Sequence, residues 1–174
     1  MTCEQLEPEQ WRLSFNEPET EFVIATLAHL GQQYQEDVTK MPPALRAYWQ
    51  GNISTSEGPP SKEVRELQAD LTEARAELRA ERLTLVENWL REHELAEVRD
   101  PWTVEVSTAE RDEFISMLND RRMSLALDLR VTEEDMEADL GQIPDDRRRA
   151  AILEIDVLGH FILVMLGPQI YRGQ

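Results

Sequence analysis

Apolar residues recur every three or four positions along most of the chain, which is the spacing of a helix with one buried face. Four long segments show this pattern, and they begin near residues 17, 62, 108 and 144. The first segment follows Asn16 and the third follows Ser107, and both side chains are good helix N-caps. We therefore predict a mainly α fold, a helical bundle with shorter helices at residues 44–50 and after Thr132.

Two short segments instead alternate apolar and polar residues, as half-buried strands do. They cover residues 11–15 and 102–106, and we predict that they pair as a two-stranded β-ribbon packed against the helices. Residues 1–10 are polar and contain Pro8, so we expect a flexible tail or an edge segment. The chain shows no internal repeat, and residues 1–174 are predicted to form a single domain with a flexible loop at residues 52–60.

The segment from Lys62 to about His93 contains neither Gly nor Pro and predicts one long helix. An unbroken helix of this length would measure about 45–50 Å, whereas a globule of this size is only about 40 Å across. The helix must therefore span the domain, project from it or break. Its first half carries a narrow apolar seam with charged flanks, typical of a helix–helix contact, and its second half has a wider face that we expect to be buried. The seam consists of Val64, Leu67, Leu71 and Leu78, with Ala74 between the last two.

Charge narrows the range of partners. The chain has 18 Lys and Arg residues and 35 Asp and Glu residues, a net charge of −17. This charge repels nucleic-acid phosphates and anionic lipids, so we expect neither nucleic acid nor a membrane as a partner. Cys3 is the single cysteine, no signal peptide is recognisable, and the longest apolar run is far shorter than the ~20 residues of a membrane span. We expect a soluble cytoplasmic protein.

Polar residues inside the predicted helical core are the candidates for chemistry. Asn119 and Arg122 lie on the third long helix, and Asp156 and His160 lie one turn apart on the last. Because a buried charge needs a partner, we interpret Asn119, Arg122 and Asp156 as a structural polar network, with His160 as a satisfied core histidine. The alternative is a small enzyme or ligand sensor in which Asp156 orients His160 in a pocket between the last two helices.

The sequence offers no recognisable metal or cofactor site. None of His29, His93 and His160 has a Glu three positions before it, and one cysteine is too few for a thiolate zinc site. Residues 135–139 imitate the start of a calcium loop, but Leu140 occupies the position that requires Gly. We predict no metal and no cofactor. The acidic run at residues 133–146 is interpreted as a solvated face that could also dock a basic partner.

The helix segment Leu118-Asn119-Asp120-x-Arg122-x-x-Leu125 resembles a motif of one bacterial family. Residues 131–133 and 155–158 resemble the acidic turn and the last helix of that family, although Arg130 stands where it favours Gly. The family is the uncharacterised domain of unknown function two-zero-one-seven, which is common in actinobacteria. The resemblance covers residues 110–168 and implies a mostly helical fold without any known activity.

These observations favour a non-enzymatic protein-binding or regulatory domain over an enzyme. The chain is strongly acidic, and a long helix carries a contact seam. No nucleophile accompanies Asp156 and His160. We therefore predict that the seam from Val64 to Leu78 binds a protein partner or a second copy of the chain.

Overall fold

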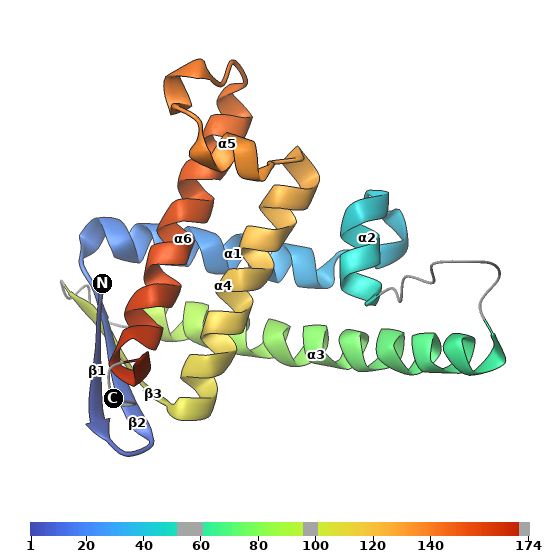
Figure 1. The fold of residues 1–174 in the computed structure, drawn as a ribbon. Coiled ribbons are helices and arrows are strands. Elements are labelled where there is room, and N and C mark those ends of the chain that lie inside the picture. The colour runs from blue at the N-terminus through green and yellow to red at the C-terminus, as the bar shows by residue number, and fades with distance from the viewer. Residues whose placement is uncertain (52–60, 96–100, 171–174) are drawn as a thin grey trace.

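The computed structural model describes residues 1–51, 61–95 and 101–170, and it is mainly α with a small antiparallel sheet. The predicted loop at residues 52–60 lies outside the described residues. Figure 1 shows the sheet at one end of the molecule, with the long helices extending from it. The helices are α1 (Glu17–Gln35), α2 (Pro43–Gln50), α3 (Lys62–Leu95), α4 (Thr108–Leu129), α5 (Glu133–Glu137) and α6 (Asp146–Ile170), and short 3-10 turns occur at Val38–Lys40 and Leu140–Gln142.

The sheet has three strands rather than the predicted two. Strand β2 (Gln10–Phe15) pairs with β3 (Trp102–Ser107), with Leu13 opposite Val104. Its other edge pairs with β1 (Thr2–Glu7), so residues 1–10 are not a flexible tail. The amino group of Met1 forms an ion pair with Glu19 on α1, which fixes the first strand at its start. The sequence of β1 is mostly polar and does not show the alternation of a half-buried strand. Only Cys3, Gln5 and Leu6 are half-buried.

The helix starts agree with the capping residues in the sequence. Asn16 and Ser107 each accept a hydrogen bond from the backbone of the third helical residue, and the Glu at that position bonds back to the cap. These are complete capping boxes, which satisfy two otherwise unpaired N–H groups at each helix start. At its other end α4 stops at Arg130, whose φ of 52° is the left-handed conformation that favours Gly.

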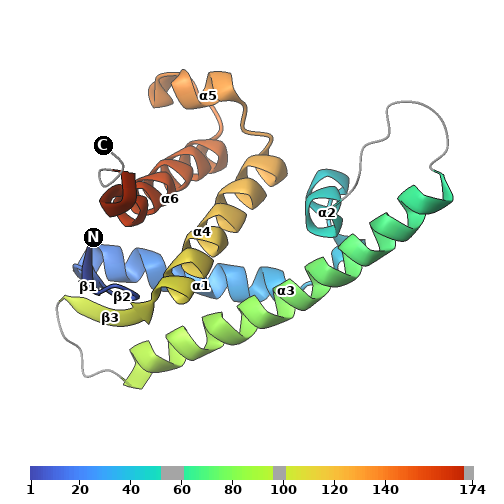
Figure 2. The same cartoon turned by 60° about the horizontal axis from the view of Figure 1, so that its bottom comes forward.

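The helices form two pairs, α1 with α3 and α4 with α6, and the second pair crosses the first (Figure 2). The core lies where these pairs meet the sheet. Phe15 of β2 stacks on Trp102 at 5.3 Å and contacts Phe161 of α6 at 6.2 Å. On α3, the buried residues begin at Arg79 and include Val86 and Trp89, so the second half of this helix is the buried half, as predicted.

Helix α6 is not the central helix that its composition predicts. It packs on α4 and on β1, and its opposite side is open to solvent, with Leu153, Val157 and Leu163 exposed. By length and composition alone α6 could cross a membrane, with a mean hydropathy of 1.9 over an 18-residue window within Asp146–Gly167. The buried core helix of a soluble protein meets the same criterion, and 33% of the α6 window is buried.

Gly31 provides the close contact between α1 and α3. A Cβ atom at Gly31 would lie 3.3 Å from Cγ1 of Val86, which is tighter than ordinary packing. At Gly159, a Cβ atom would meet only the Arg122 guanidinium, at 3.7 Å, an ordinary contact. Glycine is therefore needed for close helix packing at Gly31 and not at Gly159.

We expect Gly31→Val to lower the free energy of unfolding by about 1–3 kcal/mol, because the added methyl groups overpack the contact with Val86. Gly159→Ala should be neutral or raise stability by up to about 1 kcal/mol, because Ala is the better helix former. Urea unfolding of both variants measures the difference. Equal effects of the two substitutions would contradict a steric limit at Gly31.

Candidate functional site

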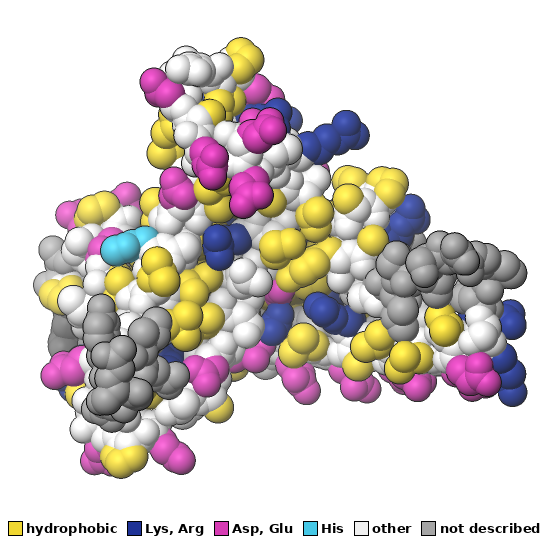
Figure 3. All heavy atoms as spheres, in the orientation of Figure 1, with side chains coloured by type: hydrophobic (Ala, Val, Ile, Leu, Met, Phe, Trp, Pro, Cys, Tyr) yellow, Lys and Arg dark blue, Asp and Glu magenta, His cyan; other side chains and the backbone are white. Residues whose placement is uncertain are grey.

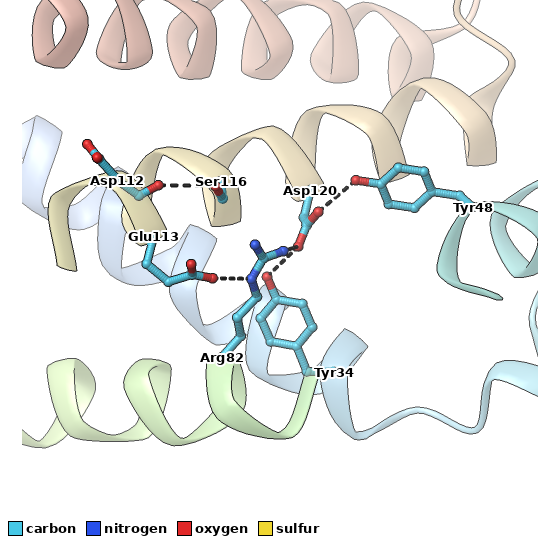
Figure 4. Close-up of polar contacts among 7 residues, drawn as sticks. All are labelled: Tyr34, Tyr48, Arg82, Asp112, Glu113, Ser116 and Asp120. Carbon is cyan, nitrogen blue, oxygen red and sulfur yellow. Dashed lines mark hydrogen bonds and ion pairs between the residues drawn. The ribbon is translucent and has the colours of Figure 1, made fainter. Parts of the chain in front are cut away.

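A buried charged network joins α3 to the rest of the protein. Arg82 of α3 forms ion pairs with Asp120 and Glu113, both on α4 (Figure 4). Arg82 and Asp120 are 7% and 3% exposed, so this pair is almost completely removed from water. Buried ions require such partners, because desolvation of an unpaired charge costs several kcal/mol.

Two tyrosines complete the coordination of Asp120. Tyr34 of α1 donates a hydrogen bond to Oδ2 at 2.9 Å, and Tyr48 of α2 donates one to Oδ1 at 2.6 Å. The carboxylate therefore joins α4 to α1, α2 and α3 (Figure 4). Burial, followed by the charge of Asp120, raises the pKa of Tyr34 well above its ordinary value of 10.0. Burial and the hydrogen bond to Asp120 likewise raise the pKa of Tyr48.

Arg79 fixes α3 to the end of α1. Its Nη2 donates to the carbonyl oxygens of Gln33 and Tyr34 at 2.9 Å, and to that of Glu36 at 2.7 Å. A cation at a helix C-terminus satisfies carbonyls that have no partner inside the helix and interacts favourably with the helix dipole. The same guanidinium lies 5.4 Å from the ring centroid of Trp49 on α2. Arg79 and Arg82 together hold the second half of α3 in place.

The first half of α3 extends away from the crossing of the helix pairs, with α2 beside it (Figures 1 and 2). We call residues Lys62–Leu78 the α3 arm. Its contact with α2 is polar, since the carbonyl of Gln50 accepts hydrogen bonds from Gln68 at 3.1 Å and from Thr72 at 3.3 Å. The predicted seam follows the edge of this contact, where Leu71 approaches Gly51.

The α3 arm presents an apolar row beside an acidic row. Val64, Leu71 and Leu78 are half-buried, whereas Leu67 is 53% exposed. A row of carboxylates, which we call the acidic stripe, lies one residue before each seam position, and all of its side chains are exposed. Figure 3 shows hydrophobic side chains above Asp and Glu side chains along α3. The acidic stripe consists of Glu63, Glu66, Asp70, Glu73 and Glu77.

The predicted network of Asn119, Arg122 and Asp156 is wrong. Asn119 and Asp156 are exposed, and Arg122 forms no ion pair within the described ranges. The guanidinium of Arg122 lies instead against Gly159, and the link between α4 and α6 is the ion pair of Arg121 with Glu154 at 2.6 Å. Asp156 is exposed on α6, and no ion pair joins it to Arg122 among the described residues.

The alternative, an enzymatic pocket formed by Asp156 and His160 between the last two helices, is not supported by the positions of these residues. His160 is exposed, as Asp156 is, and neither residue lines any of three clefts on the described part of the chain. Phe161 of α6, which packs against Phe15 of the sheet, lines none of them either. A cleft of about 600 Å³ lies between α1, α4 and the start of α2. Among the described residues, no group of three or more His, Cys, Asp or Glu side chains is placed to hold a metal ion.

Sequence reasoning missed the buried arginines, although a signal was present. Arg79 and Arg82 continue the row that Val86 and Trp89 occupy, with spacings of three and four residues. A charged residue in register with a buried face indicates a buried, partnered charge. Arg111 is a further case, with no exposed surface and its guanidinium 4.0 Å from the ring centroid of Trp11.

Comparison with known proteins identifies no relative. No family model, no curated protein and no solved structure matches the chain.

We expect Asp120→Ala to lower the free energy of unfolding by about 3–5 kcal/mol, because it leaves Arg82 buried with half of its partners and strands two tyrosine hydroxyls. Asp156→Ala is the matched control, since it removes an exposed carboxylate and should change stability by less than about 0.5 kcal/mol. Urea unfolding compares the two. A larger loss for the Asp156 variant would contradict this assignment.

Because of Tyr34 and Tyr48, we expect the free energy of unfolding to fall at alkaline pH. Their pKa values are raised in the folded state, so the folded state holds the two phenolic protons more tightly than the unfolded chain does. Their contribution is present below about pH 10 and is lost as the pH rises further. Urea unfolding between about pH 8 and pH 11 should show this decline, and Tyr34→Phe/Tyr48→Phe should reduce its slope. An unchanged slope in the double variant would contradict it.

Proposed function

We propose that this chain is a non-enzymatic, cytoplasmic protein-binding domain and that the α3 arm is its contact surface. The partner surface that fits the arm is a basic amphipathic helix. The observation that carries this proposal is the exposure of Leu67, at 53%, within a row of apolar residues beside the acidic stripe. A single exposed leucine is ordinary on a protein surface. A leucine within a row at helical spacing is typical of helix–helix recognition.

The fold supports this use of the arm. Arg79 and Arg82 fix the second half of α3, so the first half is presented on a helix whose direction is set by buried contacts. A surface that is fixed before binding loses little conformational entropy when a partner docks. Three side chains of the seam are half-buried against the protein itself, which leaves Leu67 as the most protruding apolar group.

The charge of the arm favours a basic partner over a second copy. The acidic stripe runs beside the seam, so a partner helix on the seam lies within reach of its carboxylates. A second α3 arm would bring its own acidic stripe into that position, and like charges across an interface oppose binding. Lys and Arg residues that flank leucines on a partner helix would instead find complementary charge.

A cleft lies where the seam reaches the second half of α3. It has a volume of about 260 Å³ and is lined by Glu81, Leu85, Ala109, Glu110 and Glu113. An apolar wall with carboxylates at its rim suits the long stem and charged end of Lys or Arg. The surface offered to a basic helix therefore continues from the arm to the start of α4.

We further propose that residues 110–168 belong to the uncharacterised family that they resemble. In the Leu-Asn-Asp-x-Arg segment, Leu118 is fully buried and Asp120 is the centre of the charged network. This placement supports a structural role for the segment. The proposed function therefore rests on the α3 arm and not on this segment.

Binding of a synthetic helical peptide tests the proposal, with leucines on one face and lysines on the other. We expect fluorescence anisotropy to show binding that weakens about tenfold or more in Leu67→Ser, because a buried leucine contributes about 1.5–3 kcal/mol. Leu163→Ser is the matched control, since Leu163 is 62% exposed on α6. Equal binding by the two variants would overturn the assignment to the α3 arm.

A second comparison distinguishes the effect of the acidic stripe on peptide binding from the effect of the net charge of −17. The triple variant Asp70→Asn/Glu73→Gln/Glu77→Gln should weaken peptide binding. Glu133→Gln/Glu134→Gln/Glu137→Gln removes the same charge from exposed positions on α5 and should weaken it far less. Equal losses would show that the peptide responds only to overall charge, and the proposal would fail.

A further inference from the structure

The outer face of α6 is the most apolar exposed surface among the described residues. Leu153, Val157 and Leu163 are 50%, 38% and 62% exposed, and they are three of the five large hydrophobic side chains exposed on this part of the chain. Figure 3 shows hydrophobic side chains gathered over α6. Contiguous exposed apolar surface marks an interaction site more often than scattered apolar residues do. We define the outer face of α6 as Leu153, Asp156, Val157, His160, Leu163 and Val164.

We propose that this face packs in antiparallel orientation against the same face of a second copy of the chain. The row Leu153, Val157, His160 and Val164 has the helical spacing of a packing stripe. Its midpoint falls between Leu158 and Gly159. Leu153 and Val164 lie equally far from this midpoint on opposite sides, and so do Val157 and His160. A two-fold axis at the midpoint therefore places each leucine beside a valine and each valine beside a histidine of the other copy.

The polar residues of the face select the antiparallel arrangement. Asp156 forms no ion pair or hydrogen bond within the described chain. The rings of His160 and Phe161 have centroids 6.5 Å apart, and the imidazole also interacts electrostatically with Glu19 of α1. Near the two-fold axis, Asp156 of each copy lies close to His160 of the other, and the imidazole can donate a hydrogen bond to the carboxylate. A parallel arrangement would place the two Asp156 carboxylates beside each other, where like charges repel.

The same residues disfavour a lipid surface as the occupant. Asp156 and His160 lie in the middle of the face, so burial in a bilayer would desolvate a carboxylate without a partner. The net charge of −17 also repels anionic lipids. A second copy supplies the partner for each polar group, whereas lipid supplies none.

The net charge determines how the dimer should respond to salt. Two chains of −17 repel each other over long distances, whereas the contact at α6 is apolar with local pairs. Salt shortens the Debye length to about 8 Å at physiological ionic strength, which weakens long-range repulsion more than close contacts. Dimerisation should therefore strengthen as the salt concentration rises, unlike binding of the basic peptide, which should weaken.

Sedimentation equilibrium over a range of protein concentrations tests the proposal. We expect the wild type to dimerise and His160→Glu to raise the dissociation constant about tenfold or more, because it brings carboxylates of the two copies together. The charge-exchanged variant Asp156→Lys/His160→Glu should return the constant towards the wild-type value. Both substituted residues, Asp156 and His160, are exposed, so neither variant should disturb the fold of the single chain.

Substitution of the exposed leucines Leu163 and Leu67 tests the dimer and the peptide-binding surface independently. Leu163→Ser should weaken the dimer and leave peptide binding unchanged, and Leu67→Ser should do the reverse. A wild-type chain that stays monomeric at every concentration would overturn the dimer, as would His160→Glu dimerising like the wild type. Binding of monomers to phosphatidylcholine vesicles that is lost in Leu163→Ser would overturn it in favour of a lipid surface.

Discussion

The ion pair between Arg82 and Asp120 is the interaction on which the arrangement of the helices depends. Its charges are buried, and attraction between them alone does not offset the cost of removing both from water. Tyr34, Tyr48 and Glu113 supply the remaining contacts. These partners come from α1, α2 and α4, so the ions are satisfied only when the helices meet in one arrangement. The network thereby favours one packing of helices whose apolar faces alone would permit several.

The position of this network along α3 explains the shape of the molecule. Both arginines lie in the second half of the helix, where Val86 and Trp89 continue the buried face. Among the described residues, the first half packs beside α2, through hydrogen bonds to the carbonyl of Gln50, the flank of Leu71 and the Arg75 guanidinium 5.8 Å from the ring centroid of Tyr48. One continuous helix thus serves as a core element over its second half and as an exposed surface over its first.

The positions of the helices along the chain were predicted better than the side of each helix that faces the core. Apolar period and capping residues located the four long helices, and the second half of α3 was correctly expected to be the buried one. Strand β1 was not predicted because it is mostly polar and only Cys3, Gln5 and Leu6 of it are half-buried. The polar network was assigned to Arg122 and Asp156, whereas the buried acid is Asp120. A shift of one or two residues turns the side chain by about 100° or about 200° around the helix, and sequence alone does not fix which side faces a neighbour.

The two proposed surfaces differ in the kind of partner that each can accept. The α3 arm places carboxylates beside its seam, so it complements a basic surface and opposes its own copy. On the outer face of α6, Asp156 lies on one side of the midpoint and His160 on the other. A two-fold axis therefore places Asp156 of each copy beside His160 of the other. Self-complementarity here requires a hydrogen-bond acceptor, Asp156, and a donor, His160, placed on opposite sides of the midpoint. The apolar character of α6, which by composition alone indicates a central or membrane-spanning helix, is then accounted for by a contact between chains.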